Sequence, residues 1–202
     1  MKNDSLTSSG YFLSPTINET NNDIRLTNYN ETSSDIRKIT PYFESMNTAQ
    51  SQIAAVAKWF LHKESMSNKK LQKVCYYAYA WFLVFFNDIE SFSGNLNSLS
   101  RSGFQAWVHG PVSPELYALY REYGWNNIPI VEDPPVFSED VIDLFEQVWN
   151  TYGKFSADQL ERLTHKELPW QDARKGLSPD EPSTRKIDDL VIFNYYSKMM
   201  AG

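Results

Sequence analysis

The amino-acid sequence predicts an all-α protein: a compact multi-helix single domain around a buried central helix, with a polar N-terminal arm. Three observations predict this class. Apolar residues recur at spacings of three and four along most of the chain, which is the period of one helical face. Helix start and stop signals bracket several of these segments. No stretch alternates polar and apolar residues for long, as a half-buried strand would.

The first 47 residues differ in composition from the rest of the chain. Asparagine, serine and threonine make up 21 of the first 50 residues. That composition leaves too few apolar side chains to offset the entropy of ordering the segment alone. We therefore predict an arm over residues 1–47, loose or ordered only by a partner, and one helical domain over residues 48–202.

Two helices open the predicted domain. The apolar residues of segment 53–61 fall on one helical face. A second helix, capped by Ser67 or Asn68, continues to Phe85 with apolar residues at spacings of three and four. Because tyrosine and tryptophan cover its remaining faces, this helix should be buried nearly all round. It is the predicted central helix.

Capping residues set the bounds of the later helices. Ser113, Ser138 and Ser156 are typical N-caps, whereas Gly124 and Gly153 are typical stop signals. Ser156 also begins a capping box. The prolines at 129, 134 and 135 keep the segment before Ser138 out of a helix. The predicted order is a loop over 87–103, a helix over 113–124, an irregular segment over 128–137, and helices over 138–153, from 156, from Pro169 and over 187–198.

Charge and composition exclude several classes of protein. The formal net charge is −6 with a sequence pI near 5.1, which disfavours nucleic acid as a partner. The single cysteine excludes an intramolecular disulfide framework and a multi-cysteine zinc module. The longest apolar run, 74–86, is shorter than the roughly 20 residues that cross a bilayer. With no secretory pattern at the start, we expect a cytoplasmic protein without a membrane partner.

The residue types that carry chemistry do not form a recognisable catalytic pattern. Cys75 lies in the apolar stripe of the central helix, where a thiol is usually inert packing. No two of His62, His109 and His165 have metal-ligand spacing, and there is no glycine-rich phosphate loop. We predict no catalytic residue, no metal and no cofactor. The lysines at 69, 70 and 73 are interpreted as the solvated side of the central helix, with contact to a phosphate backbone as the alternative.

The segment from Gly103 to Tyr117 is the most specific part of the sequence. Gly110-Pro111 breaks the chain sharply and Pro114 fixes the next helix start. The position of Trp107 relative to the helix that follows is thereby fixed. Two interpretations stay open on physical grounds: a rigid elbow that packs aromatic residues into the core, or a preformed aromatic anchor site.

Three separated motifs in this chain resemble a known family. They are Lys70-Leu71-Gln72-Lys73 with Tyr76-Tyr77-Ala78; Phe104 to Val112 with Tyr117; and Leu163-Thr164-His165 with Pro169-Trp170 and Ala173. Their order and spacing are similar to the Panacea antitoxin domain, which includes phage-associated GepA-like and SocA-type antitoxins. The resemblance covers residues 50–196. It departs at Gln105, where the family usually has glutamate, and at His109, where tyrosine is frequent.

The resemblance implies a non-enzymatic, prophage-associated antitoxin that neutralises a protein toxin encoded beside it by direct binding. It implies that a set of motif residues shapes the region that recognises the toxin. Some of these residues can be buried and stabilise the fold without contacting the toxin. An alternative is a proteolytic adaptor that delivers the toxin to an ATP-dependent protease. Minor alternatives are an autoregulatory DNA-binding protein and a small hydrolase. The residues carried over from the family motifs are Trp107, His109, Pro111, Tyr117, His165 and Trp170.

Overall fold

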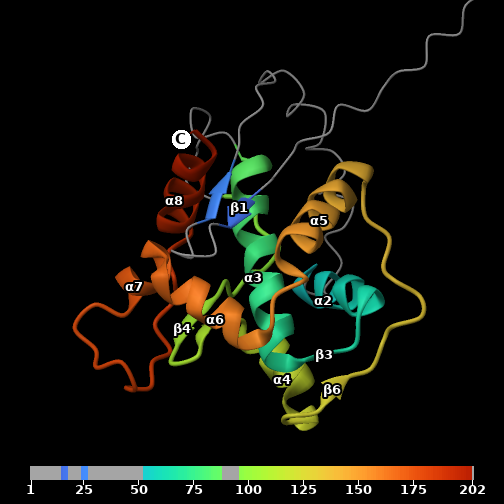
Figure 1. Cartoon of the computed structure of the whole chain (residues 1–202), viewed down its shortest axis with the longest axis horizontal. Helices are drawn as coiled ribbons and strands as arrows, with labels where there is room; N and C mark the ends of the chain where they lie inside the picture. The colour runs from blue at the N-terminus through green and yellow to red at the C-terminus, as the bar shows by residue number, and fades with distance from the viewer. Residues whose placement is uncertain (1–14, 18–23, 27–51, 88–95, 202) are drawn as a thin grey trace, which may run out of the picture.

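The computed structural model describes residues 15–17, 24–26, 52–87 and 96–201, and within these ranges it is mostly helical (Figure 1). The all-α prediction is confirmed, because the remaining strands form only small two-stranded sheets. The α-helices are α2 (Gln52–Lys63), α3 (Asn68–Phe85), α4 (Pro114–Tyr120), α5 (Glu139–Tyr152), α6 (Ala157–Lys166), α7 (Leu168–Ala173) and α8 (Asp189–Ala201).

Helix α3 is the centre of the domain, as predicted. Every residue from Leu71 to Val84 is buried, and α3 contacts α2, α5, α6 and α8. Figure 1 shows α3 in the middle, with α2 and α5 on one side and α7 and α8 on the other. The choice of cap that the sequence left open is resolved, since the side chain of Ser67 accepts a hydrogen bond from Lys70 N. The helix is therefore surrounded by the others.

The helix bounds follow the predicted caps closely. Ser113 Oγ accepts from Leu116 N at the start of α4, and the Ser156 capping box is complete on both sides. Ser138 is the N-cap of α5 without a side-chain bond. The helix predicted up to Gly124 divides in two, because a short 3-10 helix, η3 (Arg121–Tyr123), follows α4. Gly124 then has a φ of 55°, a left-handed conformation that favours glycine.

The last two helices are displaced slightly from their predicted bounds. Helix α7 begins at Leu168, one residue before Pro169. Helix α8 begins at Asp189, two residues after the predicted start at Ile187. Ile187 instead donates its backbone N–H to Phe104 O at 2.8 Å, and this bond connects the segment before α8 to the segment before β4.

The short strands are the elements that the sequence did not predict. Three antiparallel pairs occur in the described residues. The predicted loop over 87–103 is described only at 87 and 96–103. Residues 96–103 are irregular, as expected, and so are residues 129–137. The pairs are β1 (Pro15–Ile17) with β2 (Ile24–Leu26), β3 (Met66–Ser67) with β6 (Asn127–Ile128), and β4 (Gln105–Trp107) with β5 (Gly110–Val112).

The predicted arm falls mostly outside the described residues. Of residues 1–47 the structure describes only β1 and β2, so the boundary at 47/48 stays a prediction. From residue 52 onward, the core accommodates the high aromatic content. Trp81 packs edge-on against Tyr196 at 5.1 Å between centroids, and Tyr77 stacks on Tyr152 at 3.7 Å. Such pairs add roughly 0.5–1.5 kcal/mol each to the effect of burial.

Candidate functional site

The β4–β5 hairpin is the centre of the motif region. Gln105 pairs with Val112 and Trp107 with Gly110, so residues 108 and 109 alone connect the strands. The hairpin packs against α3 and α6. A backbone bridge between Gln105 and Lys186 adds a third partner on its outer side. The segment interpreted as an elbow is therefore a tight hairpin fixed on several sides.

Gly110 is required by the way the hairpin approaches α3. Its φ is +93°, and a Cβ atom there would lie 2.6 Å from Lys73 Cε and 2.8 Å from Thr164 Oγ1. Both the backbone conformation and the space exclude a larger residue without a shift of the neighbours. The glycine thus allows β5 to approach α3 and α6 closely at this point.

Lys73 corrects one interpretation made from the sequence. The lysine was expected on the solvated side of the central helix, but only 1% of it is exposed. Its Nζ atom donates a hydrogen bond to Pro111 O at 2.9 Å. Burial lowers the pKa of Lys73 to about 7, against the raising effect of Glu161. The side chain is a buried connection between α3 and β5.

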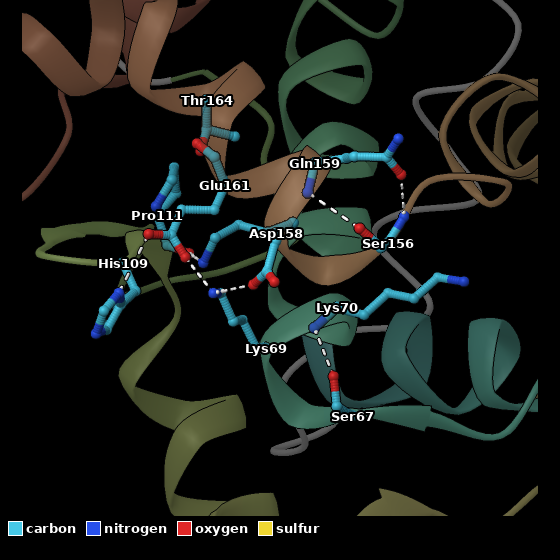
Figure 2. Close-up of polar contacts among 11 residues, drawn as sticks. Ser67, Lys69, Lys70, His109, Pro111, Ser156, Asp158, Gln159, Glu161 and Thr164 are labelled. Atoms are coloured by element: carbon cyan, nitrogen blue, oxygen red, sulfur yellow. Dashed lines mark hydrogen bonds and ion pairs between the residues drawn. The ribbon is translucent and has the colours of Figure 1, made fainter. Parts of the chain in front are cut away.

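A group of ion pairs surrounds the same end of α3. Lys69 Nζ pairs with Asp158 at 2.7 Å and also with Glu161 on α6. Figure 2 shows Lys69 directed at these two carboxylates, with His109 on the other side of Glu161. The His109 Nδ1 atom lies 3.2 Å from Glu161 Oε1. Although burial raises the pKa of Glu161, its bonds to Lys69 and His109 hold that pKa below its usual value.

Aromatic rings line the outer side of the hairpin. Trp170 Nε1 donates to Trp107 O at 3.0 Å, and the His165 ring stacks on Trp170 at 4.0 Å. The Trp107 ring lies 4.9 Å from that of Tyr117. Trp107 Nε1 donates to Gln105 Oε1 at 2.8 Å. Because that acceptor is an oxygen in both glutamine and glutamate, the departure at position 105 preserves the hydrogen bond.

The six residues carried over from the family motifs therefore lie on or next to one hairpin. They differ in exposure. Pro111 is buried, and Trp107, His165 and Trp170 are half-buried. His109 and Tyr117 are exposed. The structure thus joins the two interpretations of this segment, since the hairpin packs into the core and also leaves aromatic surface open.

Arg174 is a residue of this region that sequence reasoning missed. It is buried, and its Nη1 atom donates to Ala106 O at 3.0 Å. Its Nη2 atom donates to the carbonyl oxygens of Ser178, Pro179 and Glu181. One guanidinium thereby holds the turn after α7 against β4. An isolated arginine in a polar stretch gives no sequence signal for this role.

Glu167 is a second missed residue, and it lies in the core between α6 and α7. Tyr77 OH donates to one of its carboxylate oxygens at 3.0 Å and Tyr196 OH to the other at 2.7 Å. Burial raises the pKa of Glu167 to about 7, although both hydrogen bonds lower it. The carboxyl group connects α3 and α8 from inside the core.

The other candidates for chemistry are Cys75 and His62. Cys75 is fully buried, and burial raises the pKa of its thiol well above the usual range. His62 donates from Nδ1 to Val131 O at 2.9 Å. In the part of the chain that the structure describes, no group of three or more histidine, cysteine, aspartate or glutamate residues could hold a metal ion. Within the same residues, no helix has both the length and the apolar character to cross a membrane.

Comparisons with known proteins agree with the motifs. Residues 83–171 match the family described as "Antitoxin SocA-like, Panacea domain". The chain is 29% identical over 157 residues to Antitoxin SocA of Caulobacter vibrioides (strain NA1000 / CB15N), an alignment covering 68% of this chain and 78% of that protein. No solved structure matches the chain.

The matched region contains the β4–β5 hairpin. It extends from the end of α3 through the hairpin and α4 to the first half of α7. All six motif residues, from Trp107 to Trp170, lie inside it. The resemblance stated from the motifs is confirmed, since the SocA-like Panacea domain model matches this region and the chain is similar to Antitoxin SocA.

Proposed function

We propose that this protein is a non-enzymatic antitoxin that neutralises a protein toxin, encoded by the adjacent open reading frame, by binding it directly in the cytoplasm. One observation carries the proposal. The six motif residues lie on or next to one hairpin inside the matched family region, and they leave aromatic surface open there. Aromatic side chains on a rigid framework are typical anchors of protein interfaces.

The framework of the hairpin supports a binding role because its backbone is already fixed. Pro111 O is held by Lys73, Ala106 O by Arg174 and Trp107 O by Trp170. A surface that is ordered before binding loses little conformational entropy when a partner docks. The proposed toxin would therefore meet Trp107, Tyr117 and Trp170 in the positions that they hold here.

Charge supports the same kind of partner. The chain has 19 basic and 25 acidic residues, so its field attracts a basic protein and steers its approach. We propose that bound antitoxin covers or distorts the active site of the toxin. The polar arm over residues 1–47 is a second proposed contact, because a loose segment can order on a partner.

The test is co-expression with the protein encoded by the adjacent open reading frame. We expect that protein alone to arrest growth, and this chain to restore growth and co-purify with it. Absence of toxicity or of a complex would overturn the proposal. Recovery of growth with a protease-dependent fall in toxin level would indicate the adaptor alternative instead.

Two variants refine this test. His109→Ala and Tyr117→Ala change the exposed motif residues, and we expect both to weaken the complex while the fold is retained. Deletion of residues 1–47 tests the arm separately. Full neutralisation by the truncated chain would remove the arm from the proposed interface without affecting the proposal for the hairpin.

A further inference from the structure

The exposed apolar side chains of the described residues concentrate in one place. Nine large hydrophobic side chains are exposed among the residues that the structure describes, and five of the nine lie within residues 117–130. We name residues 114–133 the α4–β6 segment; it contains α4, η3, β6 and the start of the following loop. Figure 1 shows α4 and β6 at the end of the molecule where α3 begins, away from α8. The five are Tyr117, Leu119, Tyr123, Trp125 and Ile130.

Trp125 is the most exposed of these side chains, and its backbone is fixed. It is 94% exposed, a costly placement for an indole ring in water. Gly124 N donates to Arg121 O at 3.1 Å and Asn126 N to Tyr123 O at 2.9 Å. These bonds close the turn on both sides of the tryptophan. The ring is therefore presented by an ordered turn.

The whole segment is also attached to the α2–β3 connection. Ser65 Oγ donates to Ile128 O at 2.9 Å, and Val131 N donates to Leu61 O at 3.3 Å. The His62 ring donates to Val131 O from the same side. Because α2 packs on the central helix, the position of the segment is set by the core. Such preorganisation favours binding.

Acidic residues accompany the apolar side chains. The α4–β6 segment contains Glu115, Glu122, Glu132 and Asp133, against Arg121 as its one basic residue. Three of these carboxylates, at 122, 132 and 133, are exposed. The segment therefore combines an exposed tryptophan with a net negative charge.

Three lysines at the end of α2 and the start of α3 do not cancel this charge, because each of them already pairs with a carboxylate. Lys63 pairs with Glu146 and Lys70 with Glu64. Lys69 pairs with the two carboxylates of α6 described above. The end of α2 and the start of α3 are thus close to neutral, and the field at the α4–β6 segment remains acidic.

From these observations we infer that the α4–β6 segment enters an apolar pocket with a basic rim on the toxin, with Trp125 as the anchor. This inference rests on the proposed function and deepens it by naming the face and the chemistry of the partner. A second copy of the chain would bring like charges together, which is unfavourable. Nucleic acid and anionic membranes are disfavoured for the same reason.

The test measures binding of the full chain to the purified protein encoded by the adjacent open reading frame. We expect Trp125→Ala to raise Kd about 30-fold or more, as for an interface hot spot. Leu119→Ala should also weaken binding. Leu190→Ala is the matched control, because Leu190 is an exposed leucine on α8 at 39% exposure; its Kd should not change. Circular dichroism and melting temperature verify that each variant is folded.

Charge reversal tests the basic rim. We expect the double variant Glu122→Lys and Asp133→Lys to reduce the association rate about tenfold at low salt. The effect should shrink as salt is added. Asp143→Lys with Asp180→Lys makes the same change in net charge at exposed positions outside the segment. An equal loss in this control would contradict a local basic rim.

The outcomes separate the inference from the proposed function. If the unmodified chain binds and Trp125→Ala binds equally well, the inference is overturned and the proposed function stands. If the unmodified chain does not bind at all, the proposed function itself fails, and the inference fails with it. If Trp125→Ala instead changes the oligomeric state of the free chain, the segment is a self-association surface and the inference is overturned.

Discussion

The β4–β5 hairpin and the α4–β6 segment adjoin in the chain but use their aromatic residues differently. In the hairpin, Trp107 is half-buried, its indole N–H is bonded to Gln105, and its carbonyl is held by Trp170. In the segment, Trp125 is 94% exposed on a closed turn. The difference teaches that neighbouring stretches of one chain can hold one tryptophan in the fold and leave another exposed to solvent.

The strongest test of this comparison is Gly110→Ala. We expect the variant to lose about 4 kcal/mol of unfolding free energy, because it combines a left-handed backbone with contacts to Lys73 and Thr164 that are too close. Chemical denaturation measures the loss. Gly124→Ala is the matched control, since Gly124 also has a positive φ but nothing within 4 Å of a Cβ atom. Equal losses in both variants would mean that close packing at Gly110 contributes nothing.

Glu167→Gln tests the core beneath the hairpin through pH. The folded chain retains the Glu167 proton up to a pKa of about 7, whereas the unfolded chain releases it near its ordinary value of 4.5. Between these values the folded state binds more protons, so the free energy of unfolding falls as pH rises. The fall should amount to roughly 3 kcal/mol and be absent in the variant. Parallel pH profiles for both proteins would contradict this role.

Arg174→Met tests how the hairpin is held from outside. The variant removes the donor for Ala106 O and for the three carbonyls after α7. We expect a loss of about 2 kcal/mol, since a buried acceptor is left without its partner. Thermal unfolding measures it. Lys175→Met, at an exposed neighbouring position, should have little effect, and a similar loss there would show that the position rather than the guanidinium matters.

Trp125→Ala completes the comparison with the smallest expected effect on stability. Because the side chain is almost fully exposed, its removal should change the unfolding free energy by less than about 0.5 kcal/mol. The same variant is expected to weaken toxin binding strongly. A large loss of stability would show that Trp125 supports the fold, and it would remove the distinction between the two regions.

Local signals in the sequence predicted the helices well. Ser113 and Ser156 cap their helices as their positions indicate, and the apolar and aromatic run of α3 is buried as predicted. The hairpin was not predicted, because each of its strands has only three residues. Three residues are too few to show a period of two. The family resemblance selected the motif residues but did not predict where they lie relative to one another.

Contacts between residues that are far apart in the chain could not be predicted from the sequence. Lys73 resembles a surface lysine locally, and its burial depends on Pro111, 38 positions away. Glu167 likewise meets Tyr77 from 90 positions away. Such contacts are set by the packing of whole helices, so no local pattern predicts them. For the same reason the exposure of Trp125 could not be distinguished in advance from ordinary aromatic packing.

The burial of Cys75 also makes this thiol a probe for transient opening of the helical domain. It is the single thiol in 202 residues, and it lies in α3 with no exposed surface. An aromatic disulfide reagent can reach it only when the central helix separates from its neighbours, so the labelling rate measures the population of opened molecules. If a toxin binds the folded form alone, saturating toxin should slow labelling in proportion to its occupancy. The labelling rate of this one thiol then measures how far toxin binding shifts the equilibrium between folded and opened molecules.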